Sequence, residues 1–158
     1  MARPSDPPFA YVPGQTARHS EGAFDAIRDT AQSGMDEAAL AGSDAFQTGL
    51  RYLRDGFYWE AHEVLEPVWM LCPPNTPARA MVQGLIQLAN ARLKEKMGKP
   101  GAAARLYAIA RAHLAEGPRD EVMGIRKADM IAEIDSARQG KGVLQYNAHI
   151  GLNLKIFL

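Results

Sequence analysis

Cysteine is almost absent from this chain, and Cys72 is the only one among its 158 residues. A lone thiol cannot form a disulfide within the chain, whereas small secreted domains commonly depend on such bonds. The opening residues MARPSDPPFAYVPG lack the apolar core of a signal peptide, and no stretch is apolar for long enough to cross a bilayer. These absences predict a soluble, cytoplasmic protein with no membrane partner.

The chain also lacks an excess of charge of either sign. Lysine plus arginine and aspartate plus glutamate both number 18. Without a basic excess there is little to hold a nucleic acid, so no nucleic-acid partner is expected. Phosphate-binding glycine loops and the serine-nucleophile motif are missing as well. The partners that remain open are an unknown small ligand or a protein.

Apolar residues make up 47% of the chain and recur at the spacings of three and four that indicate helices. A chain of this length fits one domain. We therefore predict an all-α fold, a single domain of antiparallel helical hairpins over residues 20–140 with its motif core at 44–116. Helices are expected at residues 21–31, 44–55, 57–71, 78–96, 102–116 and 120–139.

Local signals predict where several of these helices begin and end. Asp44 with Gln47 three residues later is a capping-box pattern. Asp55-Gly56 predicts a helix end and a tight turn into the next helix. Thr76 before Pro77 predicts a helix start, because proline at the first helical position loses no needed donor.

The two ends of the chain differ from this helical middle. Residues 1–19 contain four prolines and predict an extended arm, laid over the core through Phe9 and Tyr11. Arg18 and His19 belong to this arm, and such an arm can close over a pocket. From Leu144 onward apolar residues occupy every even position, which predicts a strand-like tail at 141–158. A lone apolar strand needs a partner, which could be the helices, the N-terminal arm or another subunit, and the interpretation we favour is a homo-oligomer through this tail.

The segment FYWEAHEVLEPVW, residues 57–69, concentrates acidic, imidazole and aromatic side chains. On a helix at about 100° per residue, His62 and Glu66 share a face with Trp59. Glu63 falls to the side of that face, and Glu60 is expected to point toward solvent. Pro67 removes the helical hydrogen bond to the carbonyl of Glu63 and predicts a kink.

A carboxylate on an apolar face needs partners, because burying it alone costs several kcal/mol. The following helix offers Gln83 and Gln87, four residues apart, and Gly84 would let the two helices approach closely. The predicted centre is therefore the cluster His62–Glu63–Glu66, backed by these two amides.

Three interpretations of this cluster remain open. H-E-V-L-E has the spacing of the zinc-protease motif, which makes His62 and Glu66 metal ligands, zinc a possible cofactor and Glu63 a general base. A third ligand is not evident, and His113 is more readily explained as a satisfied core histidine.

The second interpretation is a metal-free acid–base or ligand site that uses Trp59, Trp69, Gln83 and Gln87 as contacts. In the third, the cluster is a buried ion-pair network, and the chain is a helical-repeat-like interaction module.

The motifs together resemble a known family. G-F-Y-W-E-A-H-E-V-L-E-P-V-W (56–69), Q-G-L-I-Q-L-A (83–89) and G-K-P-G-A (98–102) are similar to the bacterial and archaeal family called domain of unknown function 309, over about residues 44–116. The resemblance implies a compact all-helical domain and no established reaction. Its hallmark positions fall on Trp59, Glu60, His62, Glu63, Glu66, Trp69, Gln83 and Gln87.

Overall fold

Helices dominate the computed structural model, which describes residues 6–139, and the all-α prediction is confirmed. The described chain forms seven helices and one two-stranded hairpin. Their bounds are α1 Asp25–Arg28, α2 Glu37–Gly42, α3 Asp44–Asp55, α4 Tyr58–Leu71, α5 Pro77–Lys96, α6 Pro100–Leu114, β1 Glu121–Val122, β2 Ile125–Arg126 and α7 Lys127–Arg138.

The ends of the central helices follow from side-chain and backbone chemistry. At α3 the Ser43 hydroxyl accepts the N–H of Phe46, so Ser43 is the N-cap and the predicted capping box at Asp44 is wrong. Gly56 ends the same helix in the left-handed region, at φ 91°, as the turn prediction required. Thr76 caps α5 by accepting the N–H of Arg79.

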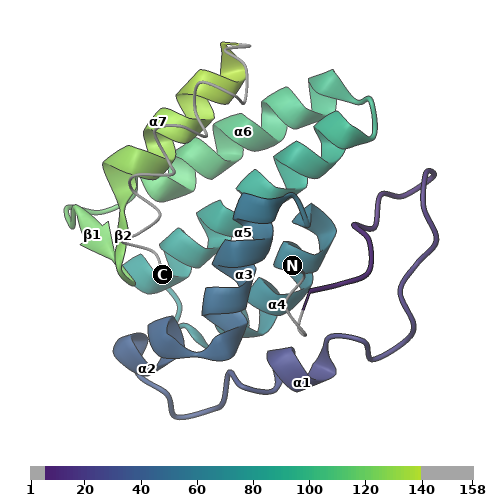
Figure 1. Ribbon diagram of the computed structural model, residues 1–158. Coiled ribbons are helices and arrows are strands. Elements are labelled where there is room, and N and C mark those ends of the chain that lie inside the picture. Colours follow the sequence, from purple (N-terminus) through teal and green to yellow (C-terminus); the bar gives the residue numbers. More distant parts are fainter. Residues whose placement is uncertain (1–5, 140–158) are drawn as a thin grey trace.

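Three helix pairs build the core (Figure 1): α3 packs on α4, α4 on α5, and α5 on α6. Glycines permit two of these approaches. A Cβ on Gly49 of α3 would lie 2.4 Å from a methyl carbon of Leu65 in α4. A Cβ on Gly84 of α5 would lie 2.7 Å from Leu114 in α6. Gly84 therefore allows a close approach to α6, and not to the motif helix α4 as expected.

Two predicted helices are shorter than expected, and α2 was not predicted. The helix placed at residues 21–31 is reduced to α1, and the helix placed at 120–139 begins with the hairpin β1–β2. Met123 and Gly124 have φ of 52° and 77°, and two successive positive φ values form a tight hairpin turn and interrupt a helix. Val122 and Ile125, paired across that turn, are fully buried.

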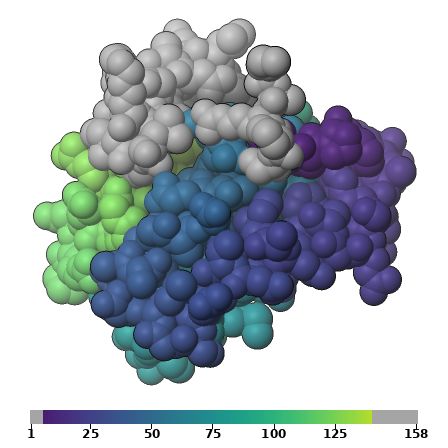
Figure 2. Space-filling model, turned by 60° about the horizontal axis from the view of Figure 1, so that its bottom comes forward, coloured from purple at the N-terminus to yellow at the C-terminus, as the bar shows by residue number. Residues whose placement is uncertain are grey.

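The N-terminal arm runs along the helices without forming a helix or strand of its own between residues 6 and 24. In the space-filling view it makes one continuous surface with α2 and α3 (Figure 2). None of the helices in residues 6–139 is long and apolar enough to cross a bilayer. The predicted strand-like tail, and the oligomer contact assigned to it, lie outside the described residues.

Candidate functional site

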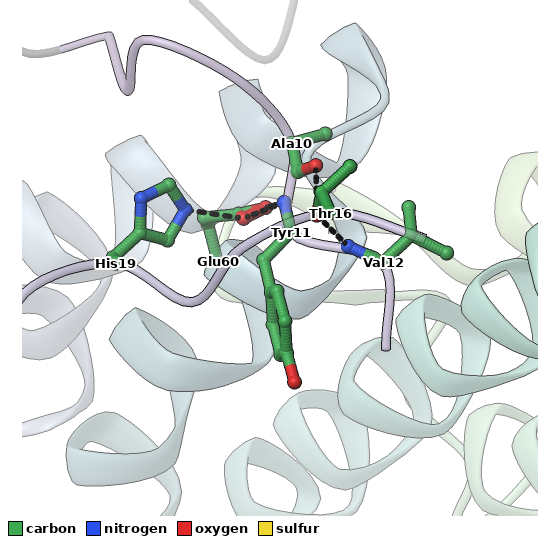
Figure 3. Close-up of polar contacts among 6 residues, drawn as sticks. All are labelled: Ala10, Tyr11, Val12, Thr16, His19 and Glu60. Atoms are coloured by element: carbon green, nitrogen blue, oxygen red, sulfur yellow. Dashed lines mark hydrogen bonds and ion pairs between the residues drawn. The ribbon is translucent and has the colours of Figure 1, made fainter. Parts of the chain in front are cut away.

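A buried carboxylate joins the arm to the motif helix. The side chain of Glu60 in α4 is 0% exposed, so the expectation that it points to solvent is wrong. The backbone N–H of Tyr11 donates to both of its carboxylate oxygens, at 3.3 and 3.1 Å, and Nε2 of His19 lies 3.3 Å from Oε2 (Figure 3). The helical periodicity placed Glu60 away from the other helices, but the arm covers that side.

Aromatic rings enclose the histidine of this pair. His19 stacks on Phe9 with ring centroids 4.8 Å apart, and it meets Phe24 edge-on at 5.2 Å. Trp59 lies 6.0 Å away at a tilt, which leaves the His19 side chain 6% exposed. The imidazole is therefore fixed in orientation by rings around it and by a carboxylate at one nitrogen.

The protonation of Glu60 reflects this enclosure. Burial raises the pKa of Glu60 above its ordinary value of 4.5, because the surrounding rings and helices exclude the water that would stabilise the charge. Hydrogen bonds from Tyr11 and His19 oppose this shift. A carboxylate with a raised pKa next to an imidazole is a pattern found at functional sites, although ion pairs with a purely structural role also produce it.

Further contacts fix the arm beside this pair. Its turn is closed by the Thr16 hydroxyl, which accepts the N–H of Val12 and donates to the carbonyl of Ala10 (Figure 3). The side-chain amide of Gln15 donates to the carbonyl of Lys96 at the end of α5, at 2.7 Å. Arg51 of α3 forms an ion pair with Asp6 at 3.4 Å. The arm is thus attached to three helices, α3, α4 and α5.

Pro67 explains a second attachment between this segment and α4. Proline has no N–H, so it leaves the carbonyl of Glu63, four residues earlier, without its helical donor. The guanidinium of Arg28 in α1 donates to that carbonyl, and it lies 3.6 Å from the Glu63 carboxylate. The helix α4 remains continuous across Pro67. The proline therefore provides the acceptor that fixes α1 against α4.

Between these two attachments lies a pocket of about 570 Å³. The segment from Arg18 to Asp25 forms one wall, and α4 contributes Trp59 and Glu63 to the other. His19 lines it, while its Nδ1 has no hydrogen-bond partner among residues 6–139. The pocket combines an oriented imidazole, acidic and basic side chains and aromatic rings, which are the groups that bind and orient small polar molecules.

His62 and Glu66 are close in sequence to Trp59 and Glu63, but they do not line the pocket. Their side chains are 34% and 38% exposed, and Nε2 of His62 is 3.4 Å from the Glu66 carboxylate. Asn90 of α5 approaches Nδ1 of His62 at 3.0 Å and also donates to Gln87 at 3.4 Å. The inward-facing ion pair predicted here is therefore a half-exposed network across α4 and α5.

A family model described as Domain of unknown function (DUF309) matches residues 46–106. This match agrees with the resemblance that the motifs predicted. The match covers α4, α5 and most of α3, while the arm and the wall of the pocket from residues 18 to 28 lie outside it. No curated protein and no solved structure matches the chain.

Within the DUF309 segment the metal prediction gains no support. Among residues 6–139, no group of three or more His, Cys, Asp or Glu side chains could hold a metal ion. Asn90 contacts Nδ1 of His62, whereas the Glu66 carboxylate faces the other ring nitrogen, Nε2. Gln83 makes no hydrogen bond within the described residues. His113 is not a core residue as predicted: its side chain is 30% exposed and lies 3.1 Å from Glu116.

The two tryptophans of the DUF309 motif have different surroundings. Trp59 borders the pocket and meets Tyr11 of the arm edge-on at 5.1 Å. Trp69 lies at the other end of α4, where the guanidinium of Arg79 stacks 4.3 Å from its ring. Cys72 nearby is buried, and burial raises the pKa of its thiol, which makes it a poor nucleophile. Only Trp59 and Glu63, of the predicted site residues, line the pocket.

Reasoning from sequence missed most of this pocket. The sequence predicts Glu60 in solvent and gives no signal for Arg28, and it indicates Arg18 and His19 only as parts of an arm able to close over a pocket. One signal was available: Pro67 frees the Glu63 carbonyl, and a freed carbonyl in a half-buried helix requires a donor from elsewhere. The identity of that donor, 35 residues away, could not be read from spacing.

Proposed function

We propose that this chain is a small-molecule-binding domain whose ligand occupies the pocket between the arm and α4. The observation that carries the proposal is the imidazole of His19, which is nine-tenths buried, is oriented by the buried Glu60 and lines a pocket of about 570 Å³. Pockets of about 300–1,000 Å³ are typical of ligand sites.

In this proposal Trp59 and Glu63 are the motif residues beside the ligand. Glu63 is also the residue of the cluster with a carboxylate at the pocket, so any acid–base step would use it or His19. His62, Glu66, Gln87 and Asn90 form a network that fixes the packing of α4 on α5. Four predictions from the sequence stay predictions. They are a metal at His62, a cytoplasmic location, assembly through the tail, and the division of the chain into arm, helical domain and tail at residues 19 and 140.

A pocket-filling variant tests the proposal. Ala23 lines the pocket and is exposed, so Ala23→Trp should occupy it while the fold is retained. Ala26 is also exposed but does not line the pocket, and Ala26→Trp is the matched control. A library of small polar metabolites is screened by ligand-detected NMR against the wild type and both variants.

We expect compounds that bind the wild type and Ala26→Trp but not Ala23→Trp. If every compound found binds all three proteins equally, the pocket is not the ligand site. Circular dichroism and melting curves establish that both variants are folded before they are compared. A parallel melting scan with a chelator and with added zinc addresses the metal prediction at His62.

A further inference from the structure

The charges around the pocket are not all matched by neighbours, and the unmatched ones have both signs. Of the lining residues, Arg28 and Glu63 already pair with each other at 3.6 Å. Arg18 forms no ion pair within residues 6–139, and its guanidinium lies over the ring of Tyr11 at 5.9 Å. Glu21 and Asp25 likewise have no cationic partner in the described part of the chain. One cation and two carboxylates therefore border the pocket unmatched.

These charges restrict the ligand chemistry. A purely anionic ligand that pairs with Arg18 would also face the carboxylates of Glu21 and Asp25. A purely cationic ligand would face Arg18 across the same space. Arg18, Glu21 and Asp25 are exposed, and like charges brought together at one pocket oppose binding. Either singly charged ligand therefore loses part of the affinity that its pairing with the opposite charge gains. A ligand that carries both charges can pair with Arg18 and with a carboxylate of Glu21 or Asp25 at the same time.

Aromatic rings in the same pocket restrict the uncharged part of the ligand as well. Trp59 and the ring of Phe24 line the same pocket, and Phe24 is 8% exposed. Such surfaces accept an apolar or aromatic substituent. His19 lies beside both rings, and its Nδ1 has no hydrogen-bond partner among residues 6–139.

We infer that the ligand is a small zwitterion with an apolar side group, which is the chemistry of a free α-amino acid. Its carboxylate pairs with Arg18, its ammonium group with Asp25 or Glu21, and its side group contacts Trp59. This inference rests on the proposed function, because it names the ligand class for the same pocket.

Four compounds that share a phenylethyl group separate the contributions. L-phenylalanine carries both charges, 2-phenylethylamine only the ammonium group, 3-phenylpropanoate only the carboxylate, and 2-phenylethanol neither. Isothermal titration of the full chain with each compound is expected to show L-phenylalanine binding about tenfold more tightly than either singly charged compound.

Variants of Arg18 and Asp25 test which protein side chain pairs with each charge of the ligand. Arg18→Gln should weaken L-phenylalanine about tenfold and should tighten the binding of 2-phenylethylamine, because the cation that repels its ammonium group is gone. Asp25→Asn should weaken L-phenylalanine similarly and should tighten the binding of 3-phenylpropanoate for the corresponding reason. The controls are Arg105→Gln, an exposed arginine on α6, and Asp44→Asn, an exposed aspartate at the first position of α3 as Asp25 is of α1. Neither control should alter any affinity.

Two results overturn the inference while the binding-domain proposal stands. One is equal affinity for L-phenylalanine and a singly charged compound. The other is no binding of the whole series while a different library compound is blocked by Ala23→Trp. L-phenylalanine that binds Ala23→Trp as well as the wild type lies elsewhere on the protein, and that result also refutes the inference. A screen in which neither the series nor the library binds, or in which every compound that binds also binds Ala23→Trp equally, refutes both the inference and the proposed function.

Discussion

Among single residues, Glu60 imposes the strictest condition on this structure. A carboxylate with 0% exposure must have donors, and within residues 6–139 both of its donors outside α4 come from the arm, the N–H of Tyr11 and the ring of His19. Leaving such a group without partners costs several kcal/mol. The arm and the motif helix are therefore parts of one energetic unit, and a change in one is felt in the other.

The protonation of Glu60 should be visible in the pH dependence of stability. Because burial raises its pKa above 4.5, the folded protein binds this proton more tightly than the unfolded chain does. The resulting stabilisation is complete below about pH 4.5 and is lost as the pH rises through the raised pKa. The free energy of unfolding of the wild type, relative to Glu60→Gln, should therefore fall with rising pH in urea titrations.

Two controls assign that dependence to Glu60. His19 faces the same carboxylate, so the titrations are repeated with His19→Gln in both proteins, where the fall should persist. Glu66→Gln, at a side chain 38% exposed, should show no comparable fall relative to the wild type. An equal fall with Glu66→Gln would mean that the effect belongs to the whole protein and not to Glu60.

Among the helices and strands, α4 has a missing hydrogen bond at Pro67 that leaves the carbonyl of Glu63 free to accept from Arg28. Pro67→Ala would return the N–H that the carbonyl of Glu63 lacks, and this donor would compete with Arg28 for the same oxygen. We expect a weaker attachment of the segment around α1, with faster amide hydrogen exchange at residues 20–31. Global stability should stay equal or rise, because proline inside a helix is unfavourable.

The control for this change is Pro77→Ala, because Pro77 occupies the first turn of α5, where its missing N–H leaves no helical acceptor free. Exchange at residues 20–31 should not respond to it. If Pro67→Ala also leaves that exchange unchanged, the guanidinium of Arg28 does not depend on the freed carbonyl.

Elements with strong local signals could be predicted from the sequence, and those set by context could not. Gly56 specifies the C-terminal end of α3 and Thr76 the start of α5, and both signals are local to the sequence. The hairpin at residues 121–126 was missed because Met123 in the left-handed region is rare for a residue with a side chain, and its 5% exposure shows that burial favours it there. No local sequence pattern indicates that burial of a side chain offsets the cost of a positive φ.

In the molecule as a whole, the candidate site depends on pairings that periodicity does not specify. Spacing of four placed His62 and Glu66 side by side correctly, since both lie on one helix. His19 and Glu60 are 41 residues apart, and their contact depends on the path of the whole arm. The family resemblance indicated α4 and α5 as the place of a functional site. It could not predict the pocket wall at residues 18–28, which lies outside the matched residues 46–106.

Removing the arm tests whether arm and helices form one unit. A variant that lacks residues 1–19 takes both arm partners from Glu60 and should lose about 2–4 kcal/mol in the free energy of unfolding, measured by urea denaturation. In the full chain, Glu60→Leu should destabilise because Tyr11 and His19 lose their acceptor. In the shortened chain it should be neutral or stabilising, since those donors are already gone. The double-mutant cycle should give a coupling of about 1 kcal/mol or more, whereas equal effects of Glu60→Leu in both chains would show that arm and carboxylate act independently.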